Sequence, residues 1–277
     1  MRDAVLIDGV PSEAAWLHDR GFQFGDGLFE TLAIRDGEPC LWSAHMDRLR
    51  AGAGRLGVSC PDPALLYREC CALAAGHERA VIKIYVTAGD SARGYRRPPS
   101  PVSRRILSLS SWPYPPSGEV VWRARMCAYR LSENAQLAGM KHLNRLDQVL
   151  ARAEWQDDTF DEGIVRGQDG RVVSGTMSNI FLQHGNELHT PSIDSAGIAG
   201  VVRRLVIDLS QRHGTNASER RVEVDDLWRA DAIFMTNSLV GIARLVRLDD
   251  RTFDLDVAEH PAIAAARLHC HRPGGQA

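Results

Sequence analysis

Only two lysines, Lys83 and Lys141, occur in this chain of 277 residues, although it carries 33 basic residues in all. The other 31 are arginines, which can replace lysine on a solvated surface but cannot form a Schiff base, because the guanidinium stays protonated at any working pH. A lysine amine can condense with an aldehyde. Both lysines are therefore candidates for covalent chemistry.

The two candidates differ in their surroundings. Lys141 lies in the segment LAGMKHLNRL, where it is expected to be semi-exposed, backed by apolar residues and close to the start of a helix. Partial desolvation would lower its pKa from about 10.4 and supply free amine near neutrality, although a surface charge is the simpler reading of a lone lysine. Lys83 shares a strand face with Val81 and Tyr85 and can extend its ammonium to solvent, which favours a structural role.

A second chemical feature is the segment GIAGVV, residues 197–202, in which glycines lead directly into a predicted helix. The N-terminus of a helix can bind a phosphate group through its free backbone N–H groups. Glycine-to-helix turns are common, however, and most of them bind nothing. The segment by itself leaves both interpretations open.

Short strands and hairpins are expected to position these residues. Apolar runs bounded by turn residues predict strands over 80–87 and 106–112, the first of them central in its sheet. Turn dipeptides between apolar runs predict four hairpins, at Asp8-Gly9, Asp36-Gly37, Asp169-Gly170 and Gly185-Asn186.

Three helices follow from the spacing of apolar residues. Ser43 is the expected cap of a helix whose buried face carries Leu49, Ala53 and Leu56. Asn144 is the expected N-cap of a helix with an apolar stripe at Leu146, Val149, Leu150 and Ala153. The third helix begins directly after the glycines of 197–200.

The proline-rich stretch PYPPSG, between Trp112 and Glu119, can continue neither a strand ladder nor a helix. It predicts a domain boundary. We expect a small N-terminal domain over 1–113, a linker over 114–119 and a larger C-terminal domain over 120–277.

Composition indicates a globular protein that acts on a small molecule. The net charge is −2, 44% of residues are hydrophobic, and like charges do not cluster, which argues against nucleic-acid and membrane partners. No signal peptide or run of about 18 apolar residues is present, so a cytoplasmic location is expected. Six scattered cysteines without CxxC spacing predict reduced thiols and no metal site.

Six segments are spread over nearly the whole chain: FGDGLFET (24–31), AHMDRL (44–49), LAGMKHLNRLDQVLARAEW (137–155), SGTMSNIFL (174–182), GIAGVVR (197–203) and MTNSLVGI (235–242). Taken together they resemble the fold-type IV family of pyridoxal-phosphate (PLP) enzymes, the class IV aminotransferases and related lyases. The resemblance implies a two-domain α/β (α+β) fold, with a smaller N-terminal α/β domain and a larger C-terminal pseudo-barrel. It also implies PLP as cofactor and a homodimer.

The resemblance assigns roles at matching positions. Lys141 would hold the cofactor aldehyde, and Thr31 would lie beside the reacting carbon, although a strand threonine is often just a good β-former. The other positions would bind the cofactor (Arg48, Ser174, the backbone N–H groups of Val201 and Val202, and Ser238) or the substrate carboxylate (Arg93 and Tyr95).

Two positions depart from the family pattern. Ser174 stands where the family usually has a glutamate that contacts the pyridine nitrogen, and a neutral pyridine is a poorer electron sink. Ala88 stands where relatives commonly have arginine, so carboxylate recognition there is open.

Within the family, the lysine segment KHLNRLDQVLAR and the ARGY loop (92–95) are most similar to the 4-amino-4-deoxychorismate lyases, which form 4-aminobenzoate and pyruvate. Elimination that yields an aromatic ring could tolerate Ser174. A branched-chain or D-amino-acid aminotransferase of the same fold is the alternative. A PLP-binding protein that has lost catalysis is a third reading.

Overall fold

The computed structural model describes residues 6–7, 10–11, 15–99, 101–114 and 119–273. The predicted turn at Asp8-Gly9 and positions 115–118 of the predicted linker lie outside these residues. The strands on either side of that turn, β1 (Leu6–Ile7) and β2 (Val10–Pro11), pair antiparallel. A short 3₁₀ helix, η1 (Ala15–His18), and helix α1 (Arg20–Phe24) follow.

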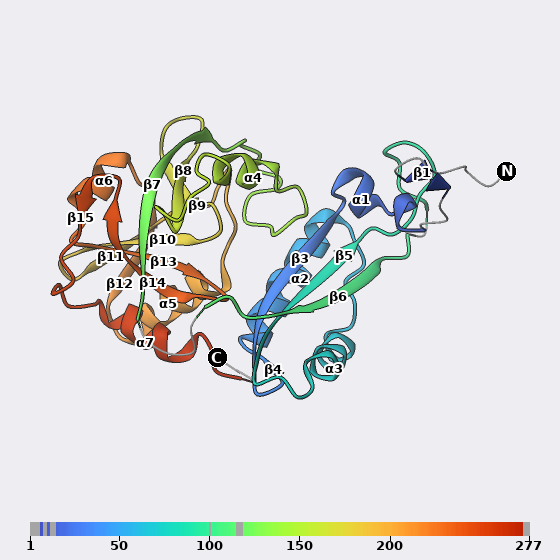
Figure 1. The fold of residues 1–277 in the computed structure, drawn as a ribbon, viewed down its shortest axis with the longest axis horizontal. Coiled ribbons are helices and arrows are strands. Elements are labelled where there is room, and N and C mark those ends of the chain that lie inside the picture. Colours follow the sequence, from blue (N-terminus) through green and yellow to red (C-terminus); the bar gives the residue numbers. More distant parts are fainter. Residues whose placement is uncertain (1–5, 8–9, 12–14, 100, 115–118, 274–277) are drawn as a thin grey trace.

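The first sheet is antiparallel with the order β4-β3-β5-β6, and its strands are β3 (Gly27–Arg35), β4 (Glu38–Pro39), β5 (Arg79–Thr87) and β6 (Arg104–Ser110). The predicted central strand is confirmed, because β5 pairs with β3 on one side and β6 on the other. Helices α2 (Trp42–Leu56) and α3 (Pro63–Ala74) cover one apolar face of this sheet. Figure 1 shows this unit beside the larger one.

The second sheet has nine strands in the order β12-β11-β10-β13-β14-β7-β8-β9, with β15 paired to β14. They are β7 (Val120–Arg130), β8 (Glu162–Arg166), β9 (Val172–Gly175), β10 (Asn179–His184), β11 (Glu187–Pro191), β12 (Asn216–Arg220), β13 (Ala232–Asn237), β14 (Gly241–Leu248) and β15 (Arg251–Thr252). Val172 on β9 donates a backbone hydrogen bond to Val222, two residues beyond β12. Because β9 and β12 are the two ends of the strand order, the sheet curls toward closure, and the expected pseudo-barrel is confirmed.

Four helices belong to this second unit: α4 (Leu146–Arg152), α5 (Val201–Arg212), α6 (Val224–Arg229) and α7 (Pro261–His269). Helices α5 and α7 pack against each other and against the sheet around Phe181 and Phe234. Helix α5 begins directly after Gly200, as the glycine-to-helix pattern predicted. The predicted hairpin turns at Asp36-Gly37, Asp169-Gly170 and Gly185-Asn186 are also confirmed, since each joins two antiparallel strands.

The two predicted caps are wrong. Helix α2 starts at Trp42 with Leu41 as its N-cap, so Ser43 already lies in the first turn. Asn144 instead donates its side-chain amide to the Gly25 carbonyl at 3.0 Å, and α4 has Arg145 at its N-cap. A side chain that finds a tertiary partner no longer caps the nearest helix.

The predicted helix with an apolar stripe is present as α4, and its stripe is exposed. Leu146, Val149 and Leu150 are 75%, 58% and 51% exposed. The stripe of α2 is buried as expected, with Leu49 and Ala53 almost inaccessible. Periodicity identified both faces, but only the fold shows that none of the described residues covers the face of α4. Within the described residues, no helix is long and apolar enough to cross a lipid bilayer.

Candidate active site

Lys141 lies in the irregular segment between β7 and α4, and this segment is fixed onto the start of β3. Phe29 donates its backbone N–H to the Lys141 carbonyl at 2.9 Å, and Leu143 donates to the Gly27 carbonyl at 3.0 Å. The Lys141 Nζ atom lies 4.2 Å from the centroid of the Phe29 ring. The backbone and the ring together hold the amine at one place above the open face of the first sheet, which is the face that α2 and α3 do not cover.

The environment of Lys141 favours its neutral amine. Burial, and then the positive charge of Arg48, lower the pKa of the Lys141 ammonium to about 7. In a large fraction of the protein molecules, Lys141 is therefore an unprotonated amine near neutral pH, which a nucleophilic or basic lysine requires.

The second lysine lies close to the first. Lys83 is exposed on β5, directly across from Thr31 in the β3–β5 register, and its charge contributes to the lowered pKa of Lys141. Both lysines of the chain therefore lie near the open face of the first sheet. The sequence could have suggested this through their scarcity, but it favoured a structural role for Lys83.

Replacing Lys83 tests this electrostatic coupling. In cofactor-free protein, Lys83→Met should raise the pKa of Lys141 above its starting value of about 7, because a like charge is removed. The pH dependence of acylation at Lys141, followed by mass spectrometry, measures that pKa, and Lys141 is then the only lysine in the chain. Arg68→Met, an equal charge change on the exposed side of α3, is the control. An unchanged labelling profile in Lys83→Met would show that the two amines are not coupled.

A buried cluster of charges supports the cation assigned to the cofactor phosphate. Arg48 donates from Nε to Glu30 Oε1 at 2.8 Å and from Nη2 to Glu30 Oε2, and His45 Nδ1 contacts the same carboxylate at 2.6 Å. Burial raises the pKa of Glu30, but the charges and hydrogen bonds of Arg48 and His45 together outweigh this and bring the pKa to about 2. Burial lowers the pKa of His45. Arg48 is therefore held by a fixed negative charge.

Sequence reasoning missed Glu30 and His45, although both lie in the segments that carry the family resemblance. A signal was present, because Glu30 alternates with Phe29 and Thr31 and so faces the side of β3 covered by α2. A carboxylate on a buried strand face requires a cationic partner.

Arg48 also contacts the segment that leads into α5, and both line a cleft. Arg48 Nη1 donates to the Ala199 carbonyl at 3.1 Å, and a cleft of about 570 Å³ is lined by Arg48, Gly200 and Val201. The first N–H groups of a helix, here those of Val201 and Val202, have no acceptor within the helix. A Cβ atom on Gly200 would lie 2.0 Å from Asn179 Oδ1, so a larger residue before the helix would have to displace the Asn179 side chain, which donates to the Ile198 carbonyl. Lys141 itself does not line this cleft.

Two hydroxyl groups, those of Ser238 and Thr236, lie at or just after the end of β13. Ser238 donates its Oγ to the Thr31 carbonyl at 2.7 Å, which joins the end of β13 to β3 across 207 residues. Thr236, two residues earlier, has a buried Oγ1 without a hydrogen-bond partner among the described residues. Thr236 was not among the residues predicted from the sequence to bind the cofactor. A buried hydroxyl without a partner is a group that a bound polar ligand could satisfy.

Ser174 is buried on β9 and donates its hydroxyl to the Gly175 carbonyl at 2.8 Å. Behind it, the fully buried carboxylate of Glu162 accepts hydrogen bonds from the Thr176 and Ser178 hydroxyls at 2.5 and 2.6 Å. Burial raises the pKa of Glu162. This carboxylate therefore holds the loop after Ser174 in place.

The two residues expected to bind the substrate carboxylate are exposed in the single chain. Arg93 and Tyr95 are exposed on the loop between β5 and β6, and Tyr95 is 84% exposed. Ala88 is buried against the core under α2 and α3, so a side chain at this position points away from the open sheet face. Ala88, which stands where relatives commonly have arginine, therefore lies on the face of this sheet that α2 and α3 cover.

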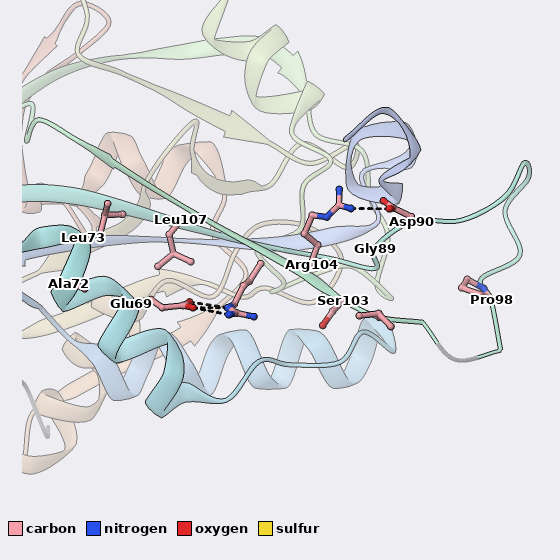
Figure 2. Close-up of a pocket in the computed structure, with 11 residues that line it drawn as sticks. Glu69, Ala72, Leu73, Gly89, Asp90, Pro98, Ser103, Arg104 and Leu107 are labelled. Carbon is pink, nitrogen blue, oxygen red and sulfur yellow. Dashed lines mark hydrogen bonds and ion pairs between the residues drawn. The ribbon is translucent and has the colours of Figure 1, made fainter. Parts of the chain in front are cut away.

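A larger groove, of about 900 Å³, lies between α3 and β6 (Figure 2). Its walls carry the ion pairs Arg105–Glu69 and Arg104–Asp90, at 2.8 and 2.9 Å. None of the residues predicted to bind cofactor or substrate lines it. Size alone does not locate the chemistry in this molecule.

The residues fit PLP as cofactor. They provide an amine of lowered pKa, an anchored arginine, a glycine-led helix N-terminus and a buried hydroxyl without a partner. These are the groups that an aldehyde and a phosphate monoester require.

A family model described as amino-transferase class IV matches residues 27–248, and the chain belongs to this family of PLP-dependent enzymes. The aminodeoxychorismate lyase of Vibrio harveyi is 33% identical over 86% of this chain and 88% of its own length. The crystal structure of the 4-amino-4-deoxychorismate lyase of Pseudomonas aeruginosa is 39% identical, with a TM-score of 0.82 over 95% of both chains. The D-alanine aminotransferase of Bacillus licheniformis is 26% identical over 90% and 89%.

Proposed function

We propose that this protein is a PLP-dependent lyase that converts 4-amino-4-deoxychorismate to 4-aminobenzoate and pyruvate, the step that supplies 4-aminobenzoate for folate. The observation that carries the proposal is the 39% identity to the Pseudomonas aeruginosa lyase over 95% of both chains. The lowered pKa of Lys141 and the anchored Arg48 support it from the chemistry of the site.

The reaction needs one proton acceptor and one proton donor. When bound, PLP makes the hydrogen on the carbon that bears the substrate amine acidic. Lys141 accepts this proton on Nζ, the ring C–H electron pair becomes a ring double bond, and the neighbouring C–O bond breaks with its electrons on oxygen. Thr31 protonates or orients the departing enolpyruvyl group, which becomes pyruvate. The ring that remains is aromatic, so the elimination is favourable.

A coupled assay tests the proposal. The PLP-loaded protein is given the product of aminodeoxychorismate synthase, and 4-aminobenzoate and pyruvate should appear in equal amounts. Protein with bound cofactor that forms neither product would refute lyase activity and favour a PLP-binding protein without catalysis.

A branched-chain or D-amino-acid aminotransferase is the second candidate, favoured by the likeness to the D-alanine aminotransferase. Glutamate or D-alanine offered with a keto acid distinguishes the two. Amino transfer faster than 4-aminobenzoate formation would support this candidate.

Replacing the Thr31 hydroxyl tests its part in the chemistry. Thr31→Val is nearly isosteric and should lower turnover by about 10²-fold, as expected when a general acid is lost. Cofactor absorbance and melting temperature should not change. Thr252→Val, at an exposed strand threonine on β15, is the control. Normal turnover in Thr31→Val would reduce Thr31 to a packing role.

The proposal includes a cytoplasmic homodimer whose subunits are divided at the 114–119 linker into a domain of 1–113 and a domain of 120–277. The six free cysteines support a reducing compartment. The exposed apolar side chains of α4, Leu146, Val149 and Leu150, support an interface with a second copy.

Introducing a charge on α4 tests the interface. Leu150→Glu should raise the dimer dissociation constant at least about a hundredfold, since a symmetric interface loses two apolar contacts of about 1.5 to 3 kcal/mol each. Leu255→Glu is the matched control, because Leu255 is 49% exposed and lies far along the chain, after β15. Analytical ultracentrifugation measures both. An unchanged dimer in Leu150→Glu would place the interface elsewhere.

A further inference from the structure

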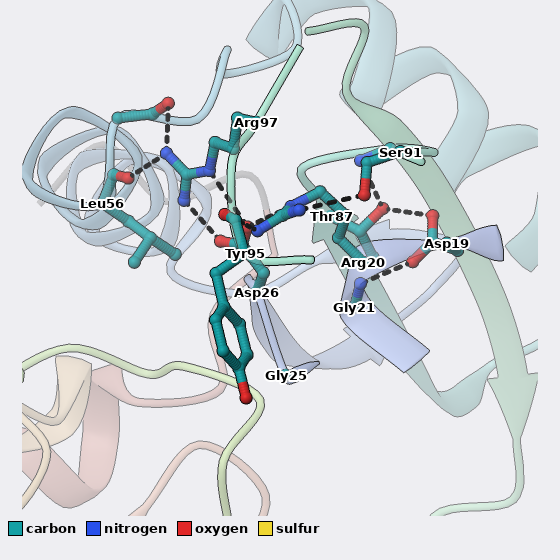
Figure 3. Close-up of polar contacts among 12 residues, drawn as sticks. Asp19, Arg20, Gly21, Gly25, Asp26, Leu56, Thr87, Ser91, Tyr95 and Arg97 are labelled. Carbon is teal, nitrogen blue, oxygen red and sulfur yellow. Dashed lines mark hydrogen bonds and ion pairs between the residues drawn. The ribbon is translucent and has the colours of Figure 1, made fainter. Parts of the chain in front are cut away.

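The loop that carries Arg93 and Tyr95 is fixed by three charged side chains (Figure 3). Asp26, at the turn before β3, accepts a hydrogen bond from Arg20 Nε at 2.7 Å and from Arg97 Nε at 3.0 Å, and Arg97 Nη2 binds its other oxygen. The Asp26 carboxylate is only 10% exposed. One buried carboxylate therefore pairs with two guanidinium groups.

Arg20 holds the middle of the loop. Its Nη2 donates to the Tyr95 carbonyl and its Nη1 to the Ser91 hydroxyl, both at 2.9 Å. The Arg20 guanidinium also lies 5.0 Å from the Phe24 ring, which packs against the Tyr95 ring at 5.3 Å. The backbone of Tyr95 is thus fixed while its side chain stays exposed.

Arg97 holds the end of the loop and ties it to α2. Its Nη1 donates to the carbonyls of Leu56 and Gly57, at 2.7 and 2.9 Å, where the last carbonyls of that helix have no partner within it. Burial raises the pKa of Asp26, but Arg97 and Arg20 outweigh it and hold the pKa below its ordinary value. The carboxylate is therefore charged throughout the physiological range.

The same turn is joined to the lysine segment on its other side. Asn144 donates to the Gly25 carbonyl at 3.0 Å, and Leu143 donates to the Gly27 carbonyl at the same distance. Asp26 lies between these two glycines. It is thus the point at which the 91–97 loop, the end of α2 and the segment of Lys141 meet.

We propose that Asp26 is a positioning residue that sets the place of Arg93 and Tyr95 for recognition of an anionic substrate, through Arg20 and Arg97. This rests on the proposed function, in which the substrate carries carboxylates. Asp26 touches neither substrate nor cofactor. It acts by keeping the loop closed onto the turn before β3, so that binding does not have to order the loop.

The first test measures the anchor without catalysis. Chymotrypsin should cleave wild-type protein slowly after Tyr95, because cleavage requires the loop to leave Arg20. In Asp26→Asn and Arg97→Gln, cleavage should be about ten- to a hundredfold faster, the range for loss of a hydrogen bond to a charged group. Arg96→Gln, at the exposed neighbouring arginine, should behave as wild type. Cleavage of both test variants at the wild-type rate would overturn the anchor.

The second test measures recognition. In PLP-loaded Asp26→Asn and Arg97→Gln, KM should rise about tenfold or more with kcat within about twofold of wild type, and calorimetry should show weaker binding of 4-aminobenzoate. If the variants are cleaved faster but keep the wild-type KM and the wild-type affinity for 4-aminobenzoate, Asp26 has no part in substrate recognition. If wild type forms no 4-aminobenzoate, the proposed function fails, while the cleavage rates still decide whether Asp26 anchors the loop. If Asp26→Asn has a lower melting temperature than wild type, the conclusion rests on Arg97→Gln, because Arg20 still pairs with Asp26 in that variant.

Discussion

Borohydride treatment of the PLP-loaded protein is expected to fix the cofactor onto Lys141 and not onto Lys83. The reason is the difference in environment, since burial and the Arg48 charge lower the pKa of Lys141 to about 7, whereas Lys83 is exposed. Peptide mapping after reduction locates the label. A label on Lys83, or on neither lysine, would contradict the assignment of the site.

Removal of the amine should have the largest kinetic effect in the molecule. Lys141→Ala should lower lyase turnover by roughly 10²- to 10⁴-fold, because the group that moves the proton is lost. Lys83→Met is the matched control, since it removes the only other lysine and should keep the label on Lys141. Turnover in Lys141→Ala close to wild type would exclude Lys141 as the base.

The second large effect is expected at Arg48. Arg48→Met leaves the carboxylate of Glu30 buried beside His45 alone, and breaking a buried ion pair in this way costs about 3 to 5 kcal/mol of unfolding free energy. PLP affinity should also fall about ten- to a hundredfold, because a cationic phosphate ligand is lost. Denaturant unfolding and cofactor titration measure the two effects separately.

A double variant separates stability from cofactor binding. Glu30→Gln with Arg48→Met removes the unpaired charge, so it should regain most of the stability lost in Arg48→Met but none of the PLP affinity. Regained affinity would show that Arg48 acts on the fold and not on the phosphate.

The same ion pair gives a pH signature. The pKa of Glu30 is about 2 in the folded protein and about 4.5 when unpaired, so the pair's contribution is fully present above about pH 5 and is lost as the pH falls toward 2. The contribution at neutral pH is about 3 kcal/mol. In Arg48→Met, the fall in stability across this pH range should be smaller than in wild type. An equal fall in both proteins would mean that other carboxylates account for it.

Much of the local structure was predictable because it depends on neighbours in the chain. Turn dipeptides fixed three hairpins, the β-branched run gave the central strand β5, and the glycines of 197–200 predicted the start of α5. The scarcity of lysine directed attention to Lys141 without any structural information. The predicted cap at Asn144 failed because its side chain binds the Gly25 carbonyl, 119 residues away, and the cap at Ser43 failed because α2 already starts at Trp42.

The candidate site depended on the tertiary structure at the positions where a face or a partner had to be known. The period of a helix or strand tells which residues share a face but not what covers it, so the spacing predicted the apolar stripe of α4 and only the structure shows that it is exposed. Glu30 and His45, which fix Arg48, come from separate elements, as do Arg20 and Arg97, which meet on Asp26.

By itself, the sequence determined which groups this protein has for chemistry: one lysine before a helix, one glycine-led helix N-terminus and one arginine at a helical position beside a buried stripe. Only the tertiary structure decided their charge states and neighbours, including the pKa of about 7 at Lys141. The physical reason is that burial and distance between charges set a pKa, and both arise from segments that are brought together only when the chain folds.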